Sequence, residues 1–215
     1  DAVLDAYLAQ DAASRVAVET FASNNCLMIA GEVTSSAKVN LAETARSVLR
    51  DIGYRSQESG LDGENYLLLC NVHQQSADID LGVSQAGGRH SAVLGGGDQG
   101  IMYGYATNET ANYMPVTLDL AHLIMRTLAD ILKEGKQMTY LRPDSKSQVT
   151  VEYSDEGVPQ RIVTIVVSTQ HDPFMDDDEA MLAQIQKDVE EILMPRVKAQ
   201  IESESVLALF NDDIQ

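Results

Sequence analysis

The sequence contains little cysteine, few basic residues and no long apolar run. Its 215 residues include two cysteines, Cys26 and Cys70. Each lies in a short apolar stretch, so we expect reduced thiols in a hydrophobic core rather than a disulfide. No stretch approaches the roughly 18 apolar residues of a membrane span, and no basic segment followed by an apolar one opens the chain as in a signal peptide. These absences predict a soluble, cytoplasmic protein with no membrane partner.

Positive charge is also scarce. Lysine and arginine number 15 against 33 aspartates and glutamates, which gives a formal net charge of −18. Such a chain repels a phosphate backbone, so general nucleic-acid binding is excluded. A nucleotide ligand is not excluded, because metal ions and a few basic side chains can neutralise its phosphates. Two groups of acidic residues are expected to form solvent-exposed faces: Asp172, Asp176, Asp177, Asp178 and Glu179, and Glu190 and Glu191.

Several common catalytic motifs are missing. Residues 135–137 lack the upstream glycine and the hydroxyl residue of a Walker A loop, and no nucleophile elbow is present. Gly95, Gly97 and Gly100 have the spacing of the dinucleotide fingerprint, but residues 101–105 are a poor start for the helix that it requires. The histidines have no metal-ligand spacing, and we expect structural or surface roles for all four: His73, His90, His122 and His171.

Helical and strand patterns alternate along the chain and predict an α+β fold with mostly antiparallel sheets. Its length allows one large domain or two small ones. We expect helices at residues 1–8, 41–52, 116–133 and 181–193, and strands at 15–21, 26–34, 66–72, 138–141, 148–153, 161–168 and 205–210. Asn40 is the expected cap of the second helix, and Gly53, Gly135 and Pro195 are the expected stops. Residues 73–92 form a long polar segment, typical of a functional or mobile loop.

Two carboxylates interrupt apolar strand patterns, namely Glu19 and Glu32. A buried carboxylate is costly unless it meets a cation or several donors. An outward-facing strand position is therefore the default for both, and a binding site is the alternative. Residues 141–148 place arginine, aspartate and lysine in what the pattern suggests is a turn between strands. These side chains either belong to an ordinary polar turn or contact an anion or nucleotide.

The most informative stretch is residues 95–110. Three successive glycines, Gly95 to Gly97, free the backbone for close approach to a ligand, and Asp98 lies directly after them. Together with other segments, this stretch resembles the methionine adenosyltransferase (S-adenosylmethionine synthetase) family. The resemblance runs in order along nearly the whole chain, through residues 1–6, 15–20, 31–37, 51–54, 75–79, 97–110, 141–149 and 168–171.

The resemblance implies an activity and a fold. The family joins L-methionine to ATP, forms S-adenosylmethionine, and then cleaves the released triphosphate to pyrophosphate and phosphate. It implies domains of mixed sheet and helices repeated with pseudo-threefold symmetry. It also implies homodimers, or dimers of dimers, that share active sites between subunits. Residues 1–76 would be the N-terminal domain, residues 77–94 a mobile loop over the active site, and residues 95–215 the middle domain.

The resemblance also implies roles for individual residues. Glu19 falls at a potassium ligand. Methionine-binding positions fall at Glu32, Gln75 and Asp98. ATP-contacting positions fall at Asp144, Ser145 and Lys146, with Lys146 facing the phosphates as the catalytic residue.

Part of the family's apparatus is not in this chain. The Gly-His-Pro-Asp-Lys motif, with an ATP-contacting histidine and a magnesium-binding aspartate, would precede residue 1. The Asn-Pro-Thr-Gly-Arg-Phe motif and the third domain would follow residue 215. We therefore expect a truncated portion of an enzyme that uses Mg²⁺ and K⁺, inactive by itself, with its magnesium ligands elsewhere. The alternatives are a non-catalytic family member that acts as a binding or regulatory subunit, and a generic purine-nucleotide binder.

Overall fold

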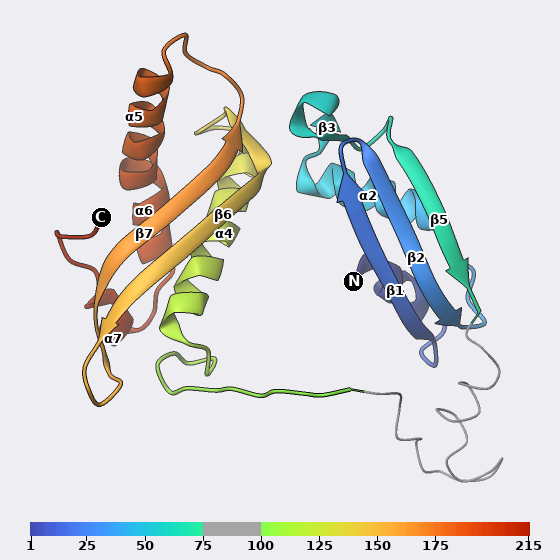
Figure 1. Cartoon of the computed structure of the whole chain (residues 1–215), viewed down its shortest axis with the longest axis horizontal. Coiled ribbons are helices and arrows are strands. Elements are labelled where there is room, and N and C mark those ends of the chain that lie inside the picture. The colour runs from blue at the N-terminus through green and yellow to red at the C-terminus, as the bar shows by residue number, and fades with distance from the viewer. Residues whose placement is uncertain (75–99) are drawn as a thin grey trace. The chain divides into compact units, whose positions relative to one another are not determined.

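The computed structural model describes residues 1–74 and 100–215 (Figure 1). They form two compact units, residues 1–103 and residues 104–215, and each is treated by itself below. Both combine helices with strands, which confirms the α+β fold. Within the described ranges, no helix is both long and apolar enough to cross a membrane. Gln75, Asp98 and the three successive glycines at 95–97 lie outside the described residues, as does the predicted loop at residues 77–94.

The first unit is built on a three-stranded sheet in the order β1–β2–β5. Strand β1 (Arg15–Ser23) pairs antiparallel with β2 (Cys26–Thr34) through a turn at Asn24 and Asn25, both of which have positive φ. Positive φ at both central residues matches the twist of a tight hairpin. Strand β5 (Leu67–His73) pairs with β2 in parallel, after the chain has passed through a helix. The three strands confirm the predicted ones.

The helices of this unit follow the predicted signals. Helix α2 (Leu41–Ile52) begins at Asn40, whose side chain accepts a hydrogen bond from the N–H of Glu43, and ends at Gly53 in the left-handed conformation. Helix α1 (Ala2–Leu8) packs against α2. The pattern did not predict three short elements between α2 and β5: β3 (Arg55–Ser56), η1 (Gln57–Ser59) and β4 (Leu61–Asp62).

Among the described residues of the first unit, one face of the sheet carries the core. Leu27 and Ile29 of β2 are buried there against Ala45 and Leu49 of α2, which lies behind the sheet in Figure 1. Strand alternation sends the neighbouring side chains to the opposite face. We call that face the open face of the first sheet. It includes Glu19, Phe21, Met28, Glu32, Leu67 and Leu69.

Both cysteines lie outside the core, which corrects the sequence prediction. Cys26 is half-buried and lies on the open face, because its partner on β5 is Leu67, which also lies on that face. Cys70 points to the core side beside Ile29 but is exposed, since β5 is an edge strand. Apolar neighbours in sequence did not imply burial here. Both thiols are free, as expected.

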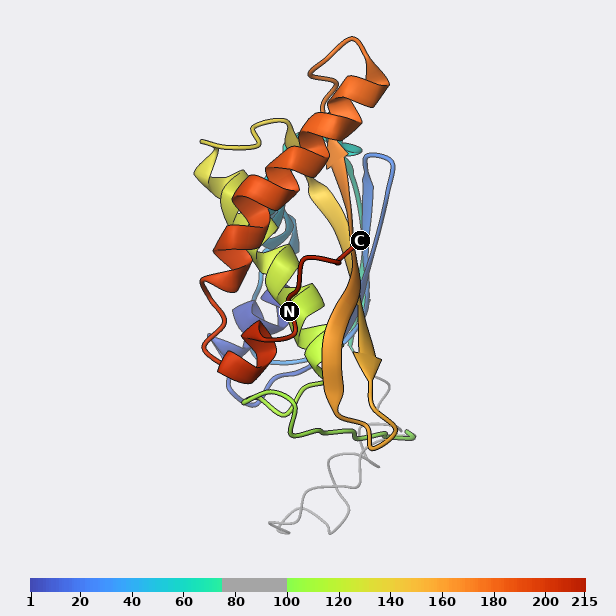
Figure 2. The same cartoon turned by 90° about the vertical axis from the view of Figure 1, so that its left-hand side faces the viewer.

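The second unit packs one hairpin against helices. Strands β6 (Leu141–Tyr153) and β7 (Pro159–His171) pair antiparallel, and α4 (Val116–Glu134) covers one face of β6. Helix α5 (Asp178–Asp188), the π-helical turn η2 (Val189–Leu193) and α6 (Met194–Lys198) follow one another as the continuous orange-to-red rod of Figure 2. Short helix α7 (Glu204–Leu207) comes after them. The most buried side chains of this core are Val116, Ile124, Ile131, Ile162, Leu193 and Val197.

Three sequence predictions for this unit are wrong. Residues 205–210 do not form a strand; they contain α7, capped by Ser203, and the spacing of Val206 and Leu209 is helical. Pro195 does not end the helical rod, because it stands in the first turn of α6, where a missing N–H is tolerated. The two strands predicted at 138–141 and 148–153 are replaced by the single strand β6, which begins only at Leu141.

Candidate functional site

Strand β6 carries the three predicted ATP-contacting residues, which the sequence pattern had placed in a turn. Within the strand, side chains alternate between its two faces. Ser147 faces α4, because its Oγ donates a hydrogen bond to the carbonyl oxygen of Ala121 at 2.8 Å. Ser145 shares that side, whereas Asp144 and Lys146 are exposed on the other. The strand therefore brings the Asp144 and Lys146 side chains together and separates them from that of Ser145.

We call this exposed side the open face of the hairpin; it includes Asp144, Lys146, Gln148 and Ser168. The hairpin has an irregularity at the point where this face begins. Leu141 pairs with His171 and Ser145 with Thr169, so residues 142–144 stand opposite Gln170 alone. Such a β-bulge bends the strand and re-aims its side chains, and bulges are frequent beside active sites. Pro143 fits there, because a bulged residue need not donate a ladder hydrogen bond.

An ion pair joins the first residue of the bulge to the residue that follows β7. Arg142 Nε donates to Asp172 Oδ1 at 2.7 Å, and the Arg142 side chain is 21% exposed. The backbone N–H of Asp172 also donates to the carbonyl oxygen of Tyr140 at 2.8 Å. Asp172 is thus a structural partner of Arg142, with a side chain that is still 40% exposed. The other six acidic residues of those two groups are exposed, as expected.

Strand β7 contributes two buried polar atoms that lack a hydrogen-bond partner among the described residues. These atoms are Gln170 Oε1 and Thr169 Oγ1. An acceptor removed from water without a partner costs about 1–3 kcal/mol. Sequence reasoning missed Gln170, although it lies in the stretch 168–171 that carried part of the resemblance.

The two strand carboxylates of the first unit face outward, as the sequence default predicted. Glu19 pairs with Ala30 and Glu32 with Ala17, so both stand on the open face of the first sheet in diagonal positions. His73 Nδ1 lies 3.9 Å from Glu32 Oε1. Exposed carboxylate oxygens can ligate a hard cation, and the potassium role of Glu19 stays a prediction. Over residues 1–74 and 100–215, no group of three or more His, Cys, Asp or Glu side chains could hold a metal ion.

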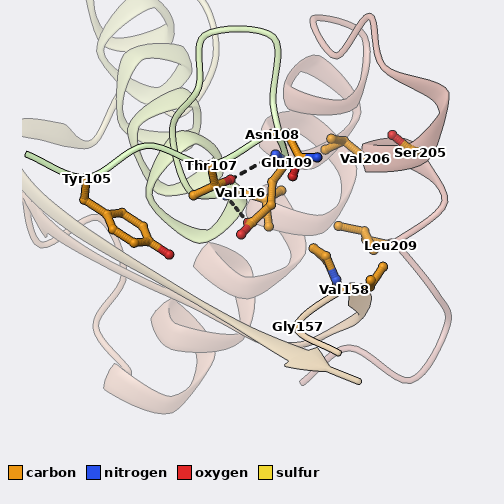
Figure 3. Close-up of a pocket in the computed structure, with 11 residues that line it drawn as sticks. Tyr105, Thr107, Asn108, Glu109, Val116, Gly157, Val158, Ser205, Val206 and Leu209 are labelled. Carbon is orange, nitrogen blue, oxygen red and sulfur yellow. Dashed lines mark hydrogen bonds between the residues drawn. The ribbon is translucent and has the colours of Figure 1, made fainter. Parts of the chain in front are cut away.

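Figure 3 shows a pocket of about 440 Å³ in the second unit, which shares no residue with the predicted site. Its organising residue is Glu109, which sequence reasoning did not single out. Glu109 Oε2 accepts hydrogen bonds from the N–H of Val116 at 2.8 Å and from the Tyr153 hydroxyl at 3.0 Å. The carboxylate thereby ties the start of α4 to the end of β6. Residues 100–106, which include Gly100 and lead into this pocket, form neither helix nor strand, so the helix that a dinucleotide fingerprint requires does not begin there.

The hydrogen bond of Tyr153 has a testable consequence. Burial, and then the bond to Glu109, raise the pKa of Tyr153 to about 12. Since an unfolded tyrosine has a pKa near 10, the stabilisation is complete below about pH 10 and is lost as the pH rises through about 12. We expect Tyr153→Phe to destabilise the second unit by at most about 1 kcal/mol at neutral pH.

Absorbance titration of the tyrosinates checks this. Tyr153→Phe should lose the step near pH 12. Tyr105→Phe is the matched control, because Tyr105 is 81% exposed on the same pocket rim, and this variant should keep the step near pH 12. Loss of the same step in both variants would contradict the assignment.

Comparison with known proteins covers both units. Residues 1–77 match the S-adenosylmethionine synthetase N-terminal domain, and residues 93–213 match the central domain of the same enzyme. The second match alone covers more than half of the chain. The chain belongs to the S-adenosylmethionine synthetase family. This confirms the family predicted from the sequence.

Individual relatives of the family are similar along the whole chain. S-adenosylmethionine synthase of Bacteroides fragilis is 53% identical over 225 aligned residues, which cover 100% of this chain and 52% of the relative. The synthases of Christiangramia forsetii and Flavobacterium johnsoniae are 52% and 49% identical, again over 100% of this chain and 50% of each relative. The chain therefore spans about half the length of these synthetase-family relatives.

Proposed function

We propose that this chain is the N-terminal and middle part of a methionine adenosyltransferase that makes S-adenosylmethionine from ATP and L-methionine. The similarity to synthases along the entire chain is the observation that carries the proposal. The shared face of Asp144 and Lys146 supports it, because a carboxylate and an ammonium on one strand face suit the sugar and phosphates of a nucleotide. No observation on the described residues favours a non-catalytic subunit.

The proposed reaction is a direct displacement. The thioether sulfur of methionine attacks ribose C5′; the S–C5′ bond forms as the bond from C5′ to the triphosphate oxygen breaks. A thioether has no proton to remove, so the step needs no general base. It needs the two reactants held in line and the leaving triphosphate stabilised. Water then cleaves the triphosphate into pyrophosphate and phosphate.

Three residues of β6 would hold ATP. Lys146 would act as the catalytic residue, with its ammonium group against the phosphate oxygens that gain charge in the displacement. Asp144, two residues earlier on the same face, would accept hydrogen bonds from the nucleoside. Ser145 points to the other side of the strand, so its contribution would come from its backbone.

Methionine would be held by Glu32, Gln75 and Asp98. Glu32 supports this assignment by its position, since its carboxylate is outward-facing and only partly exposed, and it can accept hydrogen bonds from an α-ammonium group. Gln75 and Asp98 are assigned by resemblance alone. Residues 77–94 would close over the bound substrates.

Two ions complete the proposal. Glu19 would supply one ligand for K⁺, as its exposed carboxylate allows, and Mg²⁺ would be held by residues outside this chain. Bound magnesium would neutralise charge on the phosphates. Such cations would offset the repulsion between a triphosphate and a chain of net charge −18. A cytoplasmic location would fit the two free thiols.

The proposed partner is a second copy of the enzyme, in a homodimer or dimer of dimers with shared active sites. The open face of the first sheet supports this, because Phe21, Leu67 and Leu69 are 65%, 59% and 47% exposed there. A contiguous apolar face of this kind marks an interaction surface. The face also carries Glu19 and Glu32, so pairing it would bring a partner close to the proposed ion and methionine positions.

Leu69→Asp tests the dimer. A charge introduced into an apolar interface should weaken association of the whole-gene product by about 100-fold or more, as measured by sedimentation equilibrium. Leu182→Asp is the matched control, because Leu182 is 67% exposed on α5 of the second unit. A dimer equally stable in both variants would remove the open face from the interface.

The activity itself is tested on the protein as its whole gene encodes it. Incubation with ATP, L-methionine, Mg²⁺ and K⁺ should yield S-adenosylmethionine, pyrophosphate and phosphate in equal amounts. The same assay on the 215-residue chain should yield none. Absence of product from the whole-gene protein would reject the proposal, and turnover by the short chain would reject its dependence on further segments.

A further inference from the structure

Gln170 is a further polar residue on the open face of the hairpin, which carries Asp144 and Lys146. Thr169 pairs with Ser145 and shares its side of the hairpin, so Gln170, the next residue of β7, projects to the open face. There it stands opposite the bulge at residues 142–144. Asp144 is the last residue of that bulge, so the two side chains are cross-strand neighbours on one face.

The Gln170 side chain has a free acceptor, Oε1, to which no described residue donates a hydrogen bond. This Oε1 is buried and has no hydrogen-bond partner among residues 1–74 and 100–215. Buried polar groups in folded proteins are nearly always paired, and an exception calls for a ligand or an unmet partner. The nearby Arg142 guanidinium is directed to the Asp172 carboxylate instead, at 2.7 Å.

We propose that Gln170 contacts ATP directly, by accepting a hydrogen bond from a ribose hydroxyl beside the Asp144 carboxylate. This inference rests on the proposed function, which assigns Asp144 and Lys146 to ATP. ATP offers two kinds of donor to an acceptor at this position, the amino group of adenine and the two ribose hydroxyls. Its phosphates offer none at neutral pH.

The spacing selects the ribose. Two residues along a strand span about 6.5–7 Å, and neighbouring strands lie about 4.8 Å apart. Gln170 is therefore one step along and one strand across from Lys146. If Lys146 holds the phosphates, the sugar attached to them lies over Asp144 and Gln170, whereas the amino group of adenine lies farther away. Two acceptors side by side also match the vicinal pair of ribose hydroxyls.

The bulge explains why the Asp144 and Gln170 side chains lie side by side. In a regular ladder each residue of β6 would have one partner on β7, but here three residues share Gln170. The extra residues bend β6 and turn Asp144 toward the face of Gln170. The Arg142–Asp172 ion pair lies immediately beside the bulge and braces it.

The test compares ATP with 2′-deoxy-ATP and 3′-deoxy-ATP in equilibrium binding to the whole-gene protein. The unsubstituted protein should bind ATP about tenfold more tightly than at least one deoxy analogue. Gln170→Leu, which keeps the size but removes the acceptor, should weaken ATP binding about tenfold and leave binding of that analogue unchanged. Gln148→Leu is the matched control, since Gln148 is exposed on the same face two residues beyond Lys146, and should change neither.

A second variant, Gln170→Glu, keeps the test decisive if Gln170→Leu does not fold. Gln170→Glu keeps an acceptor oxygen at the same place, so it should keep the preference for the ribose hydroxyl even if the added charge weakens overall affinity. Loss of that preference in Gln170→Glu, or unchanged ATP affinity in Gln170→Leu, overturns the role of Gln170 alone. Failure of the unsubstituted protein to bind ATP overturns both this inference and the proposed function.

Discussion

Replacing Lys146 with alanine in the whole-gene protein is expected to slow the chemical step by about 10²–10³-fold, because removal of one preorganised donor from developing negative charge typically costs that much. Lys146 is exposed on the open face of the hairpin, with no hydrophobic core to support, so folding should survive the change. Methionine binding should be nearly unaffected, since the methionine positions are assigned to other residues. Single-turnover rates and the methionine KM separate the two effects.

The control for this experiment is a lysine of the same unit. Lys187→Ala removes an exposed ammonium on α5 that lies only 4.0 Å from Glu191 in a surface ion pair. Such pairs contribute little, so its turnover should equal that of the unsubstituted enzyme. An unchanged single-turnover rate in Lys146→Ala would remove this residue from catalysis. A rate lowered equally in both variants would indicate a general effect of charge.

Leu128→Ala is expected to destabilise the second unit by about 2–5 kcal/mol, because it leaves a cavity in a packed core. Leu128 is 3% exposed on the inner side of α4, in the cluster that also contains Ile131 and Ile162. That loss is a large share of the stability of a domain of this size. Urea unfolding followed by circular dichroism measures it, and the slope of the transition should not change.

The same substitution on the outer side of α4 serves as the control. Leu118 is 41% exposed, and Leu118→Ala should cost no more than about 0.5 kcal/mol. Both variants replace leucine with alanine in the same helix, with the same change in helix propensity. The difference between their free energies of unfolding therefore reports the effect of burial. Equal losses would mean that the outer side of α4 is packed as well, contrary to the structure.

Sequence reasoning located the elements whose signals are local. The cap at Asn40, the left-handed stop at Gly53 and the heptad-like apolar spacing of α4 each depend on a few neighbouring residues. It failed where the signal is not local. Residues 141–148 contain proline, aspartate and serine, which favour turns, yet pairing with β7 along the whole hairpin holds them in a strand. Tertiary pairing overrides propensity in this way.

The same division applies to the candidate site. The ordered motifs identified the family from the sequence, together with Glu19, Glu32, Asp144 and Lys146 as candidate residues. Which of these share a surface could not be read from the chain, because the face of a strand residue depends on register and a bulge changes it. The sequence thus could not separate Ser145 from its two neighbours.

The sequence by itself determined the family and the α+β class, because those follow from ordered motifs and alternating periodicities. Only the tertiary structure decided that Gln170 stands beside Asp144, that Asp172 pairs with Arg142, and that both cysteines lie outside the core. Each of these depends on which residues strand pairing brings together across more than 20 positions of chain. Side-chain packing and hydrogen bonds join residues that are distant in the sequence, so local sequence patterns cannot predict them.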